Sequence, residues 1–487
     1  MFSDEPQVRK ILLVVVLNAV LLTACVQRAA APTVSQTLAL SDCVLSTPNV
    51  EDQVTAKCGA LSVAEDPSNP QGRQINLNIA VVPAIRRSPE PDPLFILVGG
   101  PGQSAIETFP GLFTTLFRVH EDRDIVLVDQ RGTGKSNPLN CLNVEDESVE
   151  EEQVTALLKQ CPGKLDADLR YYTTDIAMQD LDRVRSALGY ATINLYGVSY
   201  GTRAALVYLK LYPERVRSVV LDAVVDPGFV LYQDAAADGQ RALNLFFERC
   251  QADEVCQSTY PELQSEFDSL MKKLEERPTE VTIPNPITGN PLKMTVSSTL
   301  LANLIFNTLY VPDLVAMLPF NIHQAYAEEN YAPLITQAYL IDAGIYYGMF
   351  YAVACTEDAP LLHTDSDEQG MFENNLNAFV DVCTAWPHGE PPAVVHDPVL
   401  SDVPVLMFSG EADPITPPWH AEQLTGSLHN SLNLIFKGMG HGNSSNECAM
   451  RILASFIDRA SISGLDTTCV ASVEPPPFFV DFSGPQP

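Results

Sequence analysis

Short runs of valine, isoleucine and leucine recur along the chain, and glycine, proline or aspartate bounds each run. Near-continuous apolar runs of this length are typical of strands that are buried on both faces of a sheet. They predict strands at 75–84, 94–100, 124–130, 193–199, 216–224, 403–413 and 432–441. Segments with the apolar period of a helix separate several of these runs, for example 173–189. The alternation predicts an α/β fold, in which helices cover both faces of a mostly parallel sheet.

One long interval, 229–395, interrupts this alternation. It contains helical patterns such as 263–276 but no strong strand pattern. We therefore expect a mostly helical insertion, a cap, between two core segments at 41–228 and 396–473. The tail at 474–487 is rich in proline and is not expected to extend the core.

The N-terminus, residues 1–25, has the pattern of an export signal. A basic Val-Arg-Lys segment precedes a 13-residue apolar stretch at 11–23, which is shorter than the roughly 20 residues of a membrane span. The stretch ends in Leu-Thr-Ala-Cys, which resembles the bacterial lipobox. That resemblance implies a lipidated Cys25, a tether at 26–40 and, because Val26 follows the cysteine, an anchor in the outer membrane facing the periplasm. An ordinary signal peptide cut nearby and an uncleaved anchor are the alternatives.

Composition and charge narrow the functional classes. The 487 residues are 46% hydrophobic and 18% charged, which is typical of a folded globular protein. With 61 acidic and 29 basic residues the net charge is −32. Binding to nucleic acid depends on lysine and arginine that neutralise phosphates. We therefore expect no nucleic-acid partner.

The cysteines favour disulfides. The chain has 11, so a lipidated Cys25 leaves an even number, and no Cys-X-X-Cys pair suggests zinc or redox chemistry. In an oxidising compartment such cysteines form disulfides. The spacings favour the local pairs Cys43–Cys58, Cys141–Cys161, Cys250–Cys256, Cys355–Cys383 and Cys448–Cys469, although spacing alone leaves the connectivity open.

The segment Asp-Gln-Arg-Gly-Thr-Gly-Lys-Ser at 129–136 resembles the end of a phosphate-binding loop. That loop requires a glycine five positions before the glycine of Gly-Lys-Ser, and Asp129 stands there. A carboxylate at this point would face the phosphates that the loop has to hold. We therefore expect no nucleotide partner, and nothing in the sequence calls for a cofactor or a metal ion.

The strongest chemical motif is Gly-Val-Ser-Tyr-Gly at 197–201, with Ser199 at its centre. It follows the predicted strand 193–199 and precedes a helical pattern at 202–213. This is the setting of a nucleophile elbow, a tight turn from strand to helix that presents a serine above the sheet. A chance match to the short pattern is the alternative, and the flanking strand and helix disfavour it.

A serine nucleophile needs a base and an acid, which follow it in the order serine, acid, histidine in such folds. Asp413 ends one late predicted strand and His441 ends the next, 28 residues later. Carboxyl ends of parallel strands lie at one edge of a sheet, where catalytic groups gather. Glu411 is the second candidate for the acid. His420 and His429 do not end a predicted strand and are weaker candidates for the base.

Acyl transfer also needs hydrogen-bond donors for the developing oxyanion. The backbone N–H of Tyr200, directly after the nucleophile, is one candidate. The second is expected in the loop Val-Gly-Gly-Pro-Gly at 98–102. Pro101 has no N–H, so Gly99 or Gly100 must donate, and we favour Gly100. A simple Gly-Pro turn is the alternative.

Together, GGPG, DQRGTGKS, GVSYGT, GEADPITPP and GHG resemble the prolyl-aminopeptidase and tripeptidyl-aminopeptidase branch of the α/β-hydrolases, over roughly residues 40–470. The resemblance implies an α/β-hydrolase core with a largely helical cap. It also implies a serine exopeptidase that forms an acyl-enzyme through Ser199, Asp413 and His441. The family often has histidine before GGPG, whereas this chain has Val98, which weakens the assignment to the proline-specific enzymes.

The resemblance further implies peptide substrates with a free N-terminus, whose α-ammonium requires an anionic partner. Glu357, in the segment Ala-Cys-Thr-Glu-Asp, is the first candidate, and Asp358, Glu328 and Glu329 are the others. Two alternatives remain for the function. One is a carboxylesterase or lipase on the same fold, and the other is a non-catalytic binding protein held at the membrane by its lipid anchor.

Overall fold

The computed structural model describes residues 38–47, 53–141, 151–286, 288–339, 344–363, 372 and 374–485. The expected signal peptide and Cys25 lie outside the described residues, as does nearly all of the expected tether. Among the residues that are described, we find no helix with both the length and the apolar character needed to cross a bilayer.

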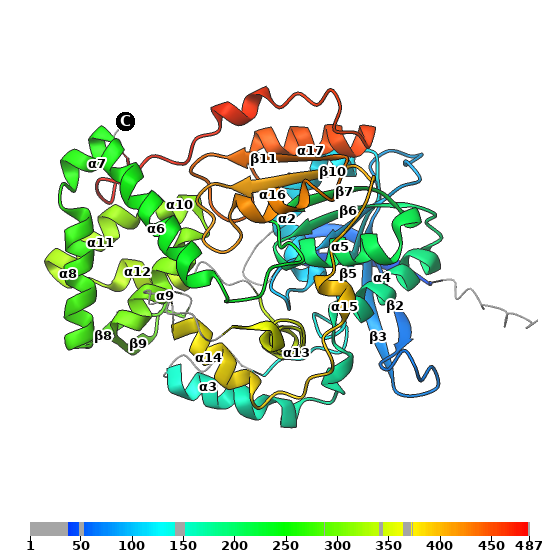
Figure 1. Ribbon diagram of the computed structural model, residues 1–487, viewed down its shortest axis with the longest axis horizontal. Coiled ribbons are helices and arrows are strands. Elements are labelled where there is room, and N and C mark those ends of the chain that lie inside the picture. The colour runs from blue at the N-terminus through cyan, green and yellow to red at the C-terminus, as the bar shows by residue number, and fades with distance from the viewer. Residues whose placement is uncertain are drawn as a thin grey trace, which may run out of the picture. The chain divides into compact units, whose positions relative to one another are not determined.

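A nine-stranded sheet with the order β1-β2-β3-β5-β4-β6-β7-β10-β11 forms the core (Figure 1). Its strands are β1 (Ser41–Ser46), β2 (Gln53–Ala64), β3 (Gln74–Val82), β4 (Leu94–Leu97), β5 (Ile125–Val128), β6 (Ile193–Val198), β7 (Val216–Asp222), β10 (Val405–Gly410) and β11 (Ser431–Phe436). Neighbours from β5 to β11 in this order are parallel, and the pairs β1–β2, β2–β3 and β3–β5 are antiparallel. The predicted mostly parallel sheet is confirmed.

All seven predicted strands are present, with ends that differ by a few residues. Strands β1 and β2 were not predicted. In β2 buried and exposed positions alternate through its first half, as in an antiparallel strand with one face in solvent. A strand of this kind has no continuous apolar run, so its signal in the sequence is weak.

Helices cover both faces of the sheet. Helices α2 (Ala105–His120) and α17 (Glu447–Arg459) pack against one face. Helices α4 (Thr174–Leu188), α5 (Tyr200–Leu211) and α16 (Pro418–Leu424) pack against the other. Each face has its own buried apolar cluster, because successive side chains of a strand point to opposite sides.

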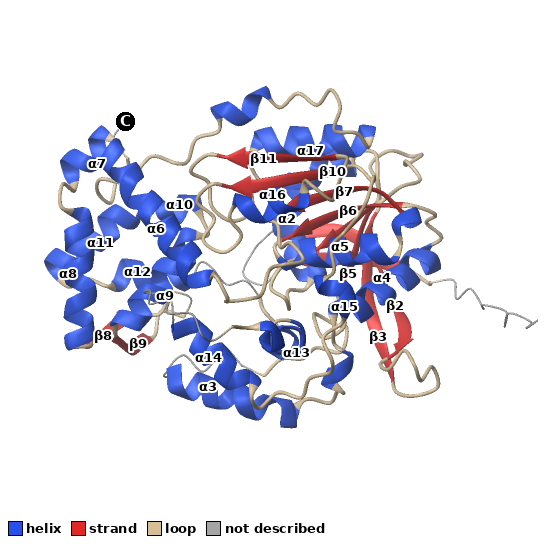
Figure 2. Cartoon of the chain, in the orientation of Figure 1, coloured by secondary structure: helices blue, strands red, loops and turns tan. Residues whose placement is uncertain are grey.

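Between β7 and β10 the chain forms the expected helical insertion. Its helices are α6 (Ala235–Ala252), α7 (Glu254–Thr259), α8 (Leu263–Glu276), α9 (Ser298–Leu309), α10 (Pro312–Val315), α11 (Leu318–Glu328), α12 (Ala332–Tyr339), α13 (Tyr347–Glu357), α14 (Asn374–Cys383) and α15 (Ala393–His396). It also contains an antiparallel hairpin, β8 (Thr279–Pro284) and β9 (Pro291–Val296), which the sequence pattern did not predict. Figure 2 shows the arrowheads of β10 and β11 directed toward these helices.

A second segment, earlier in the chain, packs with this insertion. Helix α3 (Glu151–Gln160) lies beside α14, where the indole N–H of Trp386 donates to the carbonyl of Leu158 at 3.2 Å. Leu158 and Cys161 share a buried cluster with residues of α13 and α14. By its packing, this part of the expected core segment 41–228 therefore belongs with the insertion.

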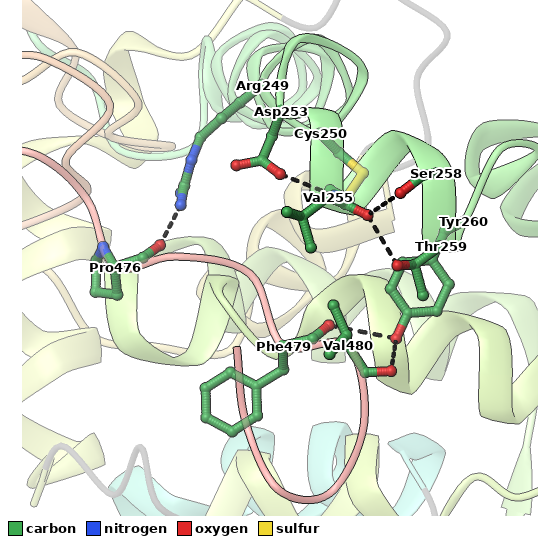
Figure 3. Close-up of a disulfide and its surroundings, with 11 residues drawn as sticks. Arg249, Cys250, Asp253, Val255, Ser258, Thr259, Tyr260, Pro476, Phe479 and Val480 are labelled. Carbon is green, nitrogen blue, oxygen red and sulfur yellow. Dashed lines mark hydrogen bonds between the residues drawn. A yellow bond between two sulfur atoms is a disulfide. The ribbon is translucent and has the colours of Figure 1, made fainter. Parts of the chain in front are cut away.

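The C-terminal tail packs on the insertion, which the sequence pattern did not predict (Figure 3). Phe478 is 3% exposed and lies in the apolar cluster of the insertion. The Arg249 guanidinium lies 4.0 Å from the centre of its ring. The hydroxyl of Tyr260 donates to the carbonyls of Phe479 and Val480, at 3.3 and 2.8 Å. The tail therefore packs against α6 and against Tyr260, the residue that follows α7.

Among the described residues five disulfides are present, and they are the local pairs favoured by spacing: Cys43–Cys58, Cys141–Cys161, Cys250–Cys256, Cys355–Cys383 and Cys448–Cys469.

Candidate active site

Ser199 lies in the turn between β6 and α5, with φ 55° and ψ −127°. A residue other than glycine rarely adopts a positive φ, and the strain is typical of a nucleophile elbow. The turn brings its backbone close to a neighbouring strand. A Cβ on Gly201 would lie 2.0 Å from the carbonyl oxygen of Leu97, which explains why glycine stands there. The N–H of Ser199 donates to the carbonyl of Asp222 at 2.9 Å.

Asp413 and His441 form a buried pair. The distance from Asp413 Oδ2 to His441 Nδ1 is 2.8 Å, and Asp413 is 0% exposed. The N–H groups of Ile415 and Thr416 both donate to Asp413 Oδ1 at 2.9 Å, and the hydroxyl of Thr416 donates to Oδ2 at 2.8 Å. Because Asp413 engages Nδ1, a catalytic base at this position would use Nε2 for proton transfer. Thr416 belongs to the same GEADPITPP motif as Asp413. Membership of that motif is the only feature of the sequence that points to Thr416.

The charges of this pair support each other. Burial alone would raise the pKa of Asp413, but the charge of His441 and the hydrogen bonds to the carboxylate outweigh burial and lower that pKa. Burial alone would lower the pKa of His441, but Asp413 and, with a smaller effect, Asp222 raise it. The site therefore favours an imidazolium next to a carboxylate, the state that forms when histidine accepts a proton from a nucleophile.

The register of the sheet places Ser199 at the same edge as this pair. Strands β6, β7, β10 and β11 are parallel neighbours, and Asp222 at the end of β7 pairs with Val198 on one side and Phe408 on the other. Ser199 follows β6, Asp413 follows β10 and His441 follows β11. All three residues therefore lie at the same carboxyl edge of the sheet.

The alternative residues have other partners. Oε2 of Glu411 accepts the N–H of Gly438 at 2.9 Å. His420 lies in α16, and its Nδ1 is 2.5 Å from Asp226 Oδ2. His429 lies in an exposed turn. Of these candidate acids and bases, Asp413 and His441 pair with each other at the sheet edge where Ser199 lies.

The glycine loop after β4 lies beside the nucleophile, because β4 is the neighbour of β6. A Cβ on Gly99 would lie 3.6 Å from the Oγ of Ser199. The N–H of Gly99 already donates to Oε1 of Gln103 at 2.8 Å. This favours Gly100 as the second oxyanion donor, next to the N–H of Tyr200.

The family described as the α/β-hydrolase fold matches residues 92–445 of the chain. The chain belongs to this family. The serine protease Hip1 of Mycobacterium tuberculosis is 28% identical to this α/β-hydrolase over 480 residues, which cover 87% of this chain and 90% of that protein.

Two further relatives match shorter parts of this α/β-hydrolase. The tripeptidyl aminopeptidase of Streptomyces coelicolor is 31% identical over 192 residues, 35% of each chain. The proline iminopeptidase of Neisseria gonorrhoeae is 30% identical over 138 residues, 28% of this chain and 34% of that protein. The α/β-hydrolase family and fold inferred from the motifs are confirmed.

The structure gives Glu357 a different place from the one expected. It ends α13 and is 0% exposed. Its two carboxylate oxygens accept the N–H and the hydroxyl of Thr174, at 2.6 and 2.8 Å. That hydroxyl also lies 2.8 Å from the hydroxyl of Tyr200. The carboxylate is thus buried behind the elbow of this α/β-hydrolase, where a substrate amine has no access to it. The expectation that Glu357 binds the amine is not supported by this position.

The other acids proposed for the amine have partners as well. Asp358 is buried, and its two oxygens accept from the guanidinium of Arg203, both at 3.0 Å. Glu329 pairs with Lys273 at 2.6 Å. Glu328 accepts from a neighbouring glutamine side chain at 3.1 Å. These contacts give no reason to place the substrate amine at any of the three.

The insertion contacts the loops that carry Asp413 and His441. Arg241 of α6 donates to the carbonyls of Glu411 and Asp413, both at 2.7 Å. The N–H of His441 donates to the carbonyl of Tyr310 at 2.9 Å, and the two rings are 4.9 Å apart. Arg241 precedes Asp413 by 172 residues, and no local pattern in the sequence marks it.

The segment that resembled a phosphate loop is a structural turn next to the site. The carboxylate of Asp129 accepts the hydroxyl of Ser104 at 2.6 Å and the N–H groups of Ile106 and Lys135 at 3.1 and 3.2 Å. Gly134 has φ 51°, and a Cβ there would lie 2.1 Å from the same carboxylate. The aspartate in place of glycine is therefore the acceptor around which this turn of the α/β-hydrolase closes.

Proposed function

We propose that this α/β-hydrolase is a serine peptidase that releases residues or short peptides from free N-termini through an acyl-enzyme. The observation that carries the proposal is the Asp413–His441 pair at 2.8 Å, at the sheet edge to which the elbow brings Ser199. The relatives named serine protease, tripeptidyl aminopeptidase and proline iminopeptidase support a peptide substrate.

Each residue then has a defined step. His441 accepts the proton of Ser199 Oγ while that oxygen attacks the carbonyl carbon of the peptide bond. The N–H groups of Gly100 and Tyr200 stabilise the oxyanion. Asp413 holds the imidazole ring and stabilises its charge. His441 then protonates the leaving amine, and a water molecule, activated by the same histidine, hydrolyses the acyl-enzyme.

A substrate panel tests the proposal. It consists of proline, alanine and tripeptide p-nitroanilides, each with a free and an acetylated N-terminus, together with a p-nitrophenyl butyrate ester. An aminopeptidase that binds the α-ammonium loses a charge-assisted hydrogen bond, worth about 1.5–3 kcal/mol, when the amine is acetylated. We expect kcat/KM to fall at least about tenfold on acetylation. Equal turnover of free and blocked peptides, or turnover of the ester alone, favours the esterase instead.

We also propose that the protein is exported and held by a lipid at Cys25 to the outer membrane, facing the periplasm. Five disulfides support an oxidising compartment, and the Leu-Thr-Ala-Cys segment supports the lipid. Labelling with palmitate tests the anchor.

A further inference from the structure

Asp222 is a buried carboxylate between the strands that carry the catalytic residues. It is the last residue of β7 and is 0% exposed. Its strand neighbours are Val198, directly before the nucleophile, and Phe408 of β10, the strand that leads to the acid. Its main chain and its side chain are thus at the edge of the sheet where the reaction is proposed to occur.

This residue contacts two catalytic segments at once. Its carbonyl accepts the N–H of Ser199 at 2.9 Å. Its carboxylate accepts the N–H of Asn443, at 2.8 and 3.0 Å to the two oxygens, and the N–H of Ser444 at 2.7 Å. Asn443 and Ser444 directly follow the loop residues His441 and Gly442. One residue therefore ties the backbone of the elbow to the backbone that follows the base.

The charge of Asp222 needs an explanation, because a buried carboxylate is costly without a cation. In the described part of the chain the side-chain hydrogen bonds of Asp222 come from neutral groups. They are the N–H groups of Asn443 and Ser444, the hydroxyl of Ser444, and the hydroxyl of Tyr196 at 3.4 Å. Burial raises the pKa of Asp222 above its ordinary value, and the N–H of Asn443, the hydroxyl and N–H of Ser444, and His441 offset part of that rise. The negative charge of Asp222 stabilises the protonated form of His441 and so raises the pKa of that histidine.

We propose that Asp222 is a positioning residue: it fixes the His441 loop relative to Ser199 and supplies, besides Asp413, a second negative charge for the imidazolium. The proposal rests on the proposed function, since it assumes that His441 accepts the proton of Ser199. It goes beyond that function because it assigns part of the stabilisation of the imidazolium to a residue outside the serine, histidine and aspartate set.

Within the described residues, the titratable groups that contact His441 or act on its charge come from three elements around it. Asp413 comes from the loop after β10, Asp222 from β7 and Tyr310 from the insertion. Tyr310 stays neutral, because burial raises its pKa well above the ordinary value. Asp222→Asn removes one of the two negative charges and leaves the other. The new amide nitrogen is a donor and cannot accept the N–H of Asn443 or Ser444, so the variant also weakens the tie to the loop.

The test is the rate at which a fluorophosphonate labels Ser199, measured from pH 5 to 9. Labelling requires the serine and its base but no particular substrate. For Asp222→Asn we expect labelling to slow about tenfold, a part of the roughly 10²–10⁴ that a general base contributes. The acid limb, the part of the labelling-rate profile that falls toward low pH as His441 becomes protonated, should move to lower pH. Loss of a neighbouring negative charge lowers the pKa of His441.

Two variants keep the charge and serve as controls. Tyr196→Phe removes the hydroxyl that lies 3.4 Å from Asp222 Oδ2 and 2.6 Å from the hydroxyl of Ser444. Its acid limb should match that of the wild type. Asp222→Glu keeps the charge and moves the backbone contacts, so it should be slow with an unshifted limb.

The outcomes distinguish a failure of the role of Asp222 from a failure of the proposed function. An unshifted acid limb in Asp222→Asn overturns the positioning role. A shift in Asp222→Glu as large as that in Asp222→Asn overturns it too, because it would show that distorted geometry and not the lost charge moves the limb. If Asp222→Asn does not fold, as judged by circular dichroism, Asp222→Glu decides alone. A wild-type labelling rate in Asp222→Glu overturns the positioning role, because the longer side chain should disturb the contacts to Asn443 and Ser444, and a shifted acid limb overturns the role of the charge. A wild-type protein that is not labelled at Ser199 refutes the proposed function itself, and this inference with it.

Discussion

Glu357→Gln is expected to change how the stability of the protein depends on pH. Glu357 lies in a buried group with Asp358 and Arg203, and its carboxylate is 3.9 Å from the guanidinium that Asp358 binds with both oxygens. The group therefore contains two carboxylates and one guanidinium. When both carboxylates are ionised, the group carries one negative charge for which the described residues show no second cation. Glutamine at 357 removes that charge and leaves Asp358 paired with Arg203.

The size of the effect follows from the pKa. Burial, its largest cause, raises the pKa of Glu357 from 4.5 to about 7, which corresponds to about 3 kcal/mol between its two protonation states. The residue is 0% exposed, so solvent screens this value little. The folded protein binds the proton more tightly than the unfolded chain does. The resulting stability is fully present below pH 4.5 and is lost as the pH rises through about 7.

The assay is urea unfolding of the oxidised protein at pH 5 and pH 8. From pH 5 to pH 8, the free energy of unfolding of the wild type should fall by up to about 3 kcal/mol more than that of Glu357→Gln. All other titrating groups are common to both proteins and cancel in this comparison. Glu248→Gln removes the same charge from an exposed position of α6 and should behave as the wild type does. An equal pH dependence in wild type and Glu357→Gln would refute the reasoning.

Three further predictions address the nucleophile, the anchor and the tail. Ser199→Ala should lower kcat by about 10⁴-fold or more with an unchanged unfolding midpoint, and a variant with a tenth of the wild-type rate excludes Ser199 as the nucleophile. Cys25→Ser should move the protein from the membrane fraction to the soluble fraction, because one lipidated cysteine carries the anchor; a wild type that takes up no palmitate contradicts the lipidation. Phe478→Ala should lower the free energy of unfolding by about 3–5 kcal/mol, as for a buried phenylalanine. The control Phe482→Ala, at a 78% exposed position, should lower it far less. Equal losses in the two variants would show that Phe478 is not packed against the insertion.

The sequence alone predicted the features that depend on local patterns. A strand buried on both faces is a continuous apolar run, so the strands from β3 to β11 of the main sheet were visible. The elbow and the order of Ser199, Asp413 and His441 follow from strand ends and short motifs. The disulfides join cysteines between 6 and 28 residues apart, and for such short separations proximity along the chain favours the pairing.

The tertiary structure alone decided which polar groups meet. Glu357 contacts Thr174 across 183 residues, Arg241 reaches Asp413 across 172, and Asp222 binds the N–H of Asn443 across 221. No spacing or period marks such pairs. The sequence presented Glu357 as an acid next to a cysteine, and only the packing of α13 against the elbow made it a buried carboxylate. Burial and partner determine whether a carboxylate binds a substrate, orients a base or supports a turn, and both are properties of contacts that form when the whole chain folds.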